Sequence, residues 1–206
     1  MLSCRTDNKI EGTWIGAYSY RSSDSIKPYS IIRSIITFDD DSYYIHDNAY
    51  NNVTFYHEGK YNLNLDTLKF TEGKKKEEII IKSINPDSLT FTSPDGILIV
   101  YKKLKSNLKT VKKTHLIGKI YLSESKFKRD TISFINDSIY LTKNGKLKPT
   151  RKYWNKISHQ GYEIIFLDYL SPPYIIQHKK NDSIILTAVH KFEYSWHMKK
   201  LNKNVW

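Results

Sequence analysis

The sequence predicts an all-β chain made of two tandem antiparallel meander units. The main observation is an internal repeat, in which residues 37–45 return as residues 133–141, 96 positions later. Both copies place a hydroxyl residue and Phe before a turn of acidic or amide residues, and Ser, Tyr and a branched aliphatic residue follow. An apolar strand, an Asp/Asn turn and a second alternating strand together indicate a β-hairpin.

The repeat extends beyond this hairpin. Further matches follow in the same order at offsets of 95 to 97 positions, and they pair 79–82 with 174–177, 87–92 with 182–187, and 101–104 with 198–201. The two halves open on Gly12-Thr13-Trp14 and Gly118-Lys119-Ile120. Matches that keep one order at nearly one offset indicate a duplication.

The repeat divides the 206 residues into two units of about 100 residues, each large enough for a small core of its own. The expected organisation is a polar N-terminal tether, a first β unit, a lysine-rich linker, a second β unit and a tail. These parts span 1–9, 10–104, 105–114, 115–201 and 202–206. A short helix in the linker is an alternative, because Leu104, Leu108 and Val111 have helical spacing.

The first unit reads as about eight short strands joined by short turns, with sequential antiparallel pairing. The expected strands include 13–20, 32–38, 43–45, 55–61, 67–71, 78–84 and 97–103. Alternation predicts that Ile36 and Phe38 share a face, as do Ile132 and Phe134 in the second copy. After the turn, Tyr43 pairs with Ile45 on one face, and Ile139 with Leu141.

The last strand alternates most regularly. One face carries Phe192, Tyr194, Trp196 and Met198, and the other carries Glu193, Ser195, His197 and Lys199. Such a strand has one face in a core and the other in water. We expect Phe38, Phe134, Leu89, Ile184, Trp196 and Met198 to be buried, and Glu193 and His197 to be exposed.

The net charge of +12 does not by itself predict nucleic-acid binding. Only 5 of the 33 basic residues are Arg, the residue that makes most base-edge contacts. The lysines are spread among abundant Asn, Ile and Tyr, so we interpret the charge as compositional bias and expect no nucleic-acid partner.

Cys4 is the single cysteine, so no intrachain disulfide forms. A small residue precedes it and polar residues follow, which resembles the end of a bacterial lipoprotein signal. We expect Cys4 to be lipidated and the protein to be anchored in the cell envelope. If Met1 is the native start, the alternative is a cytoplasmic protein with an incidental thiol.

The sequence favours a protein that is not an enzyme and that uses no cofactor or metal. It contains no nucleophile elbow, zinc-binding helix or phosphate-binding glycine loop, and the seven histidines form no ligand cluster by spacing. His57 and Glu58 point to opposite faces of a strand. Glu77-Glu78 and Asp39-Asp40-Asp41 are expected to solvate a strand end and a turn.

Gly12-Thr13-Trp14 on a first strand, followed by an eight-stranded meander that ends in an aromatic and basic strand, resembles the lipocalin-like proteins. It is similar in particular to the small lipocalin-like lipoproteins of Bacteroidota envelopes. The resemblance implies a closed barrel, and a basic residue of the last strand, Lys102 or Lys103, over Trp14. The second half keeps Gly118 and has Ile120 in place of the tryptophan.

The resemblance leaves two functions open. The first is a non-catalytic envelope module that binds a small apolar ligand or envelope component. Its candidate ligand-binding residues are Trp14, Tyr18, Trp154 and Trp196. The second is a protein-interaction module, such as an immunity protein that neutralises a partner toxin. Because large side chains fill a small barrel, we expect a packed core rather than an open calyx; an apolar cavity of about 300 Å³ or more would favour the ligand.

Overall fold

The computed structural model describes most of the chain as β-strands in two compact units. It describes residues 10–21, 30–48, 54–110, 113–124, 129–145, 147–168, 171–179, 182–188 and 194–201. The first unit ends at Leu104, and the second contains everything after it. No helix in the described ranges has the length and hydropathy needed to cross a membrane.

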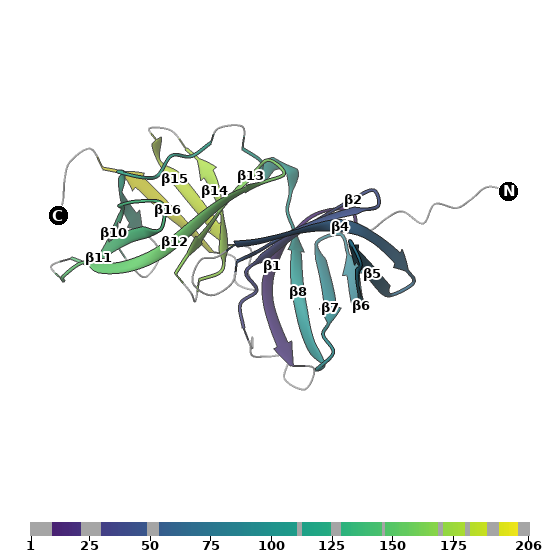
Figure 1. Ribbon diagram of the computed structural model, residues 1–206. Coiled ribbons are helices and arrows are strands. Elements are labelled where there is room, and N and C mark those ends of the chain that lie inside the picture. The colour runs from purple at the N-terminus through teal and green to yellow at the C-terminus, as the bar shows by residue number, and fades with distance from the viewer. Residues whose placement is uncertain are drawn as a thin grey trace. The chain divides into compact units, whose positions relative to one another are not determined.

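The first unit is a closed barrel of eight antiparallel strands in sequential order (Figure 1). The strands are β1 (Gly12–Arg21), β2 (Ser34–Asp39), β3 (Ser42–Asn48), β4 (Thr54–Asn64), β5 (Thr67–Glu72), β6 (Lys75–Asn85), β7 (Ser88–Thr92) and β8 (Ile97–Lys103). Pairing of β1 with β8, from Trp14 opposite Lys103 to Arg21 opposite Ile97, closes the sheet. Closure leaves no free sheet edge.

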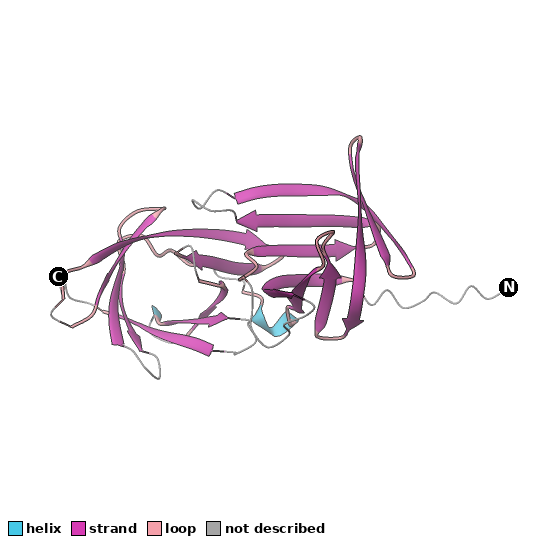
Figure 2. Cartoon of the chain, turned by 90° about the horizontal axis from the view of Figure 1, so that it is seen from below, coloured by secondary structure: helices cyan, strands magenta, loops and turns pink. Residues whose placement is uncertain are grey.

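The second unit repeats this topology, and the strands of both units dominate the chain (Figure 2). Its strands are β9 (Ile120–Glu124), β10 (Arg129–Phe134), β11 (Ile139–Lys143), β12 (Thr150–His159), β13 (Tyr162–Leu167), β14 (Pro173–His178), β15 (Ile184–Ala188) and β16 (Tyr194–Lys200). β16 pairs with β9 and closes the barrel. The predicted all-β architecture of two tandem meander barrels is therefore confirmed.

The predicted repeat occupies equivalent strands. Phe38 lies in β2 and Phe134 in β10, the second strand of each barrel. Each ring meets an aromatic ring of the fourth strand edge-on, at 4.9 Å for Phe38 and Tyr61 and 4.8 Å for Phe134 and Trp154. The backbone N–H of Tyr61 and that of Trp154 also donate to the hairpin turn in the same way, to Asp41 and Ser138. Tyr61 and Trp154 are thus structural equivalents.

The hairpin alignment needs a correction of one residue. Phe38 lies opposite Tyr43, with Asp40 at φ 50° in the turn, whereas Phe134 lies opposite Tyr140. The second turn holds one residue more. A one-residue difference moves every following side chain to the other face. Tyr140 therefore faces the core, whereas Ile139 and Leu141 share the opposite face of the strand, as alternation predicts.

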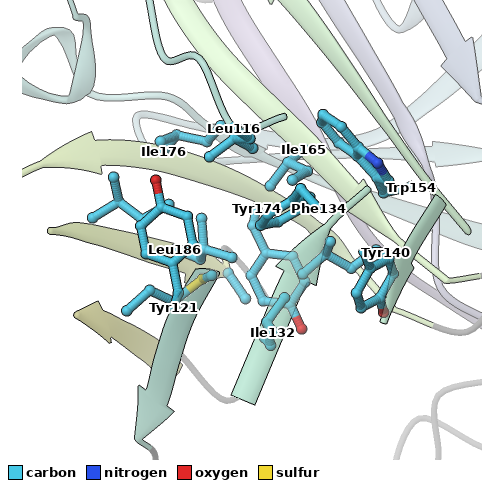
Figure 3. Packing of buried hydrophobic residues seen from close by; sticks show 14 residues of the cluster. Leu116, Tyr121, Ile132, Phe134, Tyr140, Trp154, Ile165, Tyr174, Ile176 and Leu186 are labelled. Carbon is cyan, nitrogen blue, oxygen red and sulfur yellow. The ribbon is translucent and has the colours of Figure 1, made fainter. Parts of the chain in front are cut away.

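The predicted core is largely correct. Phe38, Phe134, Leu89, Ile184 and Met198 are buried, and His197 is exposed. Trp196 is only partly buried and packs against the second core, 5.4 Å from the ring of Tyr174. Phe192 and Glu193 lie outside the described residues. Figure 3 shows the second core, in which Phe134, Tyr140 and Trp154 come from neighbouring strands and Tyr121 from β9.

One end of the first barrel is closed around Trp14. Its indole Nε1–H donates to the Ile10 carbonyl over 2.6 Å, and both residues are fully buried. The Lys103 ammonium lies 5.0 Å from the indole centroid, so the expected cation from the last strand is present. Gly12 has φ +115°, and a Cβ there would lie 2.8 Å from Lys103 Cε. The Gly-x-Trp sequence therefore combines an unusual backbone angle with close approach of a cation.

The segment between the barrels holds a single 3-10 turn, Ser106–Leu108, rather than a longer helix over its described part. Leu104 is buried, and its N–H donates to Thr13 of the first barrel. Thr114, further along, is buried in the second unit, where its N–H donates to the carboxylate of Glu163. The segment is therefore fastened at both ends, which a wholly solvated linker is not.

Candidate functional site

The first barrel contains a cavity of about 570 Å³ at the end opposite Trp14. Seven of its strands and the β7–β8 turn contribute lining residues. The apolar lining includes Ile36, Tyr43, Ile45, Phe70, Ile79, Ile80, Phe91, Ile99 and Tyr101. The cavity reaches the surface, because lining residues such as Lys75, Pro94 and Gly96 are exposed. Its volume lies within the usual range for small-molecule pockets.

The cavity and the core share their boundary. Tyr43, Phe70 and Phe91 belong to the buried cluster around Trp14 and also line the cavity. Tyr43 and Phe70 meet edge-on at 4.7 Å, and Phe91 meets Tyr101 at 5.6 Å. These rings and the aliphatic side chains together line the apolar part of the cavity. The expectation of a packed core therefore describes the Trp14 end of the first barrel and is wrong for the other end.

Strand pairing turns charged side chains into the mouth of the cavity. Across the β5–β6 hairpin, Leu68 lies opposite Ile79, Phe70 opposite Glu77, and Glu72 opposite Lys75. Side chains two residues apart on a strand share a face. Glu72 and Glu77 thus continue the inward face that begins with the buried Leu68, and Glu77, which we expected to solvate a strand end, lines the cavity.

Each inward carboxylate has a basic residue as its neighbour. Lys75 Nζ lies 2.6 Å from Glu77 Oε1, and His57 Nδ1 lies 3.4 Å from Glu72 Oε2. All four side chains are 41% to 66% exposed. Pairs this exposed contribute about 0–1 kcal/mol, so a ligand displaces them at little cost. Glu58 is exposed and accepts from Tyr56, so His57 and Glu58 face apart as predicted.

Two tyrosine hydroxyls add polar groups to the apolar lining. Tyr101 exchanges a hydrogen bond of 2.6 Å with Ser34, and burial raises the pKa of Tyr101 to about 12. The pKa of Tyr43 is also raised, first by burial and then by the charges of Glu72 and Glu77, against a smaller opposing effect of Lys75. Both phenols therefore remain neutral at ordinary pH. The electrostatic potential at the Tyr43 hydroxyl is therefore negative.

The predicted ligand-binding residues do not meet in one place. Trp14 lies in the closed end of the first barrel and is not itself a lining residue of the cavity. Tyr18 follows a bulge between Gly16 and Tyr18 and pairs with Val100, whose neighbours Ile99 and Tyr101 face inward. Tyr18 therefore faces outward, beside the ring of Tyr20 at 6.1 Å.

Trp154 and Trp196 belong to the second barrel. Trp154 is buried, and its indole N–H donates to the Asn136 carbonyl over 2.9 Å. Trp196 is partly buried against the same core. Cys4, the predicted lipidation site, lies outside the described residues. None of these predictions of ligand binding or lipidation is tested by the geometry, and they stay predictions.

A shallower depression of about 1,080 Å³ lies on the second barrel. Its charged lining comes from β9, β16 and the approach to β15, and consists of Glu124, Lys179, Asp182, Lys199 and Lys200. Lys200 pairs with Asp182 over 2.8 Å. This surface mixes charged side chains with apolar ones such as Ile184 and Met198, whereas the cavity of the first barrel is mostly apolar.

The described residues contain no group of three or more His, Cys, Asp or Glu side chains placed to hold a metal ion. Comparison with known protein families finds no family model that matches the chain. A search of curated proteins finds no matching relative.

The mouth residues were not predicted from the sequence, because Glu77 and Glu78 lie near a strand end, where charged side chains are usually solvated. The alternation that placed Phe70 in the core also places Glu72 inward, and the same rule links Glu77 to Ile79. Period-two alternation was thus the available signal. Only the pairing across the hairpin brings the two carboxylates to one opening.

Proposed function

We propose that the first barrel binds a small, largely apolar molecule and that the protein performs no catalysis. The observation that supports this most is the cavity of about 570 Å³, with its lining of aromatic and aliphatic side chains. Burial of apolar ligand surface contributes about 25 cal/mol per Å² before association costs. The lipocalin-like arrangement, with Lys103 over Trp14 at the closed end, supports the same reading.

The test uses the full chain and the neutral apolar dye Nile red. Ile79→Trp places an indole in the cavity and should abolish saturable binding of the dye. Lys82→Trp is the matched control, because Lys82 is an exposed residue of the same strand outside the cavity lining. If the unaltered protein gives no saturable fluorescence increase, or if both variants bind equally well, the proposed function is wrong.

The second candidate function is protein interaction through the second barrel, for instance by an immunity protein that neutralises a toxin. The observation that favours it is the distribution of charge. Residues 1–104 contain 13 basic and 14 acidic residues, whereas residues 105–206 contain 20 and 7. The excess of +12 thus arises wholly in the second half, and such a surface attracts an acidic partner.

For the location of the protein, we propose anchoring in the cell envelope through a lipidated Cys4. The support is the sequence around this single cysteine, and the alternative is a cytoplasmic protein. An apolar-ligand carrier held at a membrane has direct access to lipid-derived molecules. Multiple acyl chains are needed for firm anchoring, because one chain binds only reversibly.

A further inference from the structure

We propose that the ligand of the first barrel is an amphipathic amine, whose apolar body fills the cavity and whose cationic head lies between Glu72 and Glu77. This inference rests on the proposed function and specifies the chemical class of its ligand. The site is the cavity as a whole, since the apolar side chains deeper in the barrel hold the body and the mouth residues select the head.

The lining of the cavity changes with depth, from an apolar zone inside to a charged zone at the mouth. Going outward along the β5–β6 hairpin, the inward pairs change from Leu68 and Ile79, through Phe70 and Glu77, to Glu72 and Lys75. The apolar zone therefore ends where the carboxylates begin. A ligand matched to this sequence has a hydrocarbon body and a polar group at one end only.

The sign of the charge at this boundary favours a cation. Glu77 lies opposite the buried Phe70, one inward step deeper than Lys75, which lies opposite Glu72 nearer the strand ends. Lys75 also has the more exposed side chain of its pair with Glu77, at 66% against 54%. Among the lining residues, Glu72, Glu77 and Glu78 carry carboxylates and Lys75 carries an ammonium, while Glu78 is already paired with Lys69 over 2.8 Å. The raised pKa of Tyr43, to which Glu72 and Glu77 contribute more than Lys75 opposes, reports the same negative field.

A cationic head can replace the existing basic partners of the two carboxylates, whereas an anionic head is repelled by the carboxylates. An amine donates hydrogen bonds to Glu72 and Glu77 and sets Lys75 free to return to water, where it is already largely exposed. A carboxylate head of the same length approaches two like charges. Like charges at an interface are strongly unfavourable, so the mouth discriminates against fatty acids.

The test compares three probes that share one body: decylamine, decan-1-ol and decanoate, each titrated into the full chain below its micelle concentration by calorimetry. We expect the amine to bind most tightly, the alcohol less tightly and the carboxylate least. Glu72→Gln and Glu77→Gln should each reduce the preference for amine over alcohol by about five-fold. Glu58→Gln removes the same charge from an exposed residue outside the lining and should leave the preference unchanged.

The outcomes separate the two proposals. If decanoate binds as tightly as decylamine, or if the two cavity variants keep the full preference for amine, the ligand class is wrong while the binding function stands. If none of the three probes binds, the proposed function itself fails, and this inference fails with it. Higher salt should reduce the amine preference, because the head remains near solvent.

Discussion

Replacing Glu163 by Gln should destabilise the second barrel, because Glu163 holds a buried polar network together. Its side chain is 4% exposed, and Lys156 Nζ lies 2.9 Å from Oε1. The other carboxylate oxygen accepts the Thr114 N–H, and the Thr114 hydroxyl lies 2.8 Å from His178 Nε2. Lys156 also donates to the Thr114 carbonyl over 2.6 Å.

The magnitude follows from these partners. Removing one member of a fully buried ion pair costs about 3–5 kcal/mol. Lys156 is 22% exposed and keeps its bond to the Thr114 carbonyl, so part of its charge remains solvated. A hydrogen bond to a charged group contributes about 1.5–3 kcal/mol, and we expect Glu163→Gln to lower the free energy of unfolding by about 2–3 kcal/mol. Glu78→Gln, which breaks an exposed pair with Lys69, should cost less than about 1 kcal/mol.

The loss should depend on pH in a defined direction. Burial alone would raise the pKa of Glu163, but the hydrogen bonds from Thr114 and Lys156 outweigh it and hold the pKa below its ordinary value. A carboxyl with a lowered pKa stabilises the fold fully above its unfolded-state pKa, and this contribution is lost as the pH falls through the folded-state value. The difference in the free energy of unfolding between the unaltered protein and Glu163→Gln should therefore be constant near neutrality and become smaller below about pH 4.3.

Urea unfolding at several pH values, with hydrogen exchange read separately for each barrel, measures both effects. The change should appear in β12–β14 and leave β1–β8 unaffected. A loss below about 1 kcal/mol at pH 7 would refute the buried-network argument. If this difference in the free energy of unfolding grew on acidification, the pKa of Glu163 would not be lowered in the folded state.

Three further predictions concern the first half of the chain. Tyr61→Phe should be neutral or stabilising by up to about 1 kcal/mol in denaturant melts, because the Tyr61 hydroxyl is buried with no hydrogen-bond partner among the described residues; a clear loss would contradict this. Gly12→Ala should cost about 1–3 kcal/mol through its positive φ, and adding Lys103→Ala should not restore the loss. Cys4→Ser should release the full-length gene product from membranes, whereas an unmodified thiol in soluble native protein would disprove lipidation.

Much of the fold follows from local sequence rules. Alternation and turn residues placed the strands, and the repeat placed Phe38 and Phe134 in equivalent positions. The repeat alignment is wrong by one residue in the second hairpin, because its turn is longer by one residue. The side chain of Asn136 supports this turn by accepting the Ile139 N–H over 2.8 Å. Sequence self-comparison aligned the tyrosines at 44 and 140, but the core uses Tyr43 and Tyr140.

The cavity was not predictable in the same way. Whether a barrel is filled depends on how far side chains from opposite strands reach toward one another, and alternation says nothing about that distance. Gly59 illustrates the point: a Cβ there would lie 2.2 Å from the Thr71 carbonyl and 3.0 Å from the Tyr43 ring. This approach of β4 to its neighbours is a property of the closed sheet. The predicted ligand-binding residues were large aromatic residues, selected for their size. Glu72 and Glu77 are identified instead by the pairing of β5 with β6.

The two barrels close their equivalent ends with tryptophans from different strands. In the first, Trp14 of β1 donates to the carbonyl of Ile10; in the second, Trp154 of β12 donates to the carbonyl of Asn136. Trp154 is the equivalent of Tyr61, and Ile120 stands where the first unit has its tryptophan. The indole at this end thus comes from a different strand in each barrel, although both indoles donate to a backbone carbonyl there. Because the closed end carries much of the buried core, the opposite end of the first barrel is free to hold a cavity with a charged mouth.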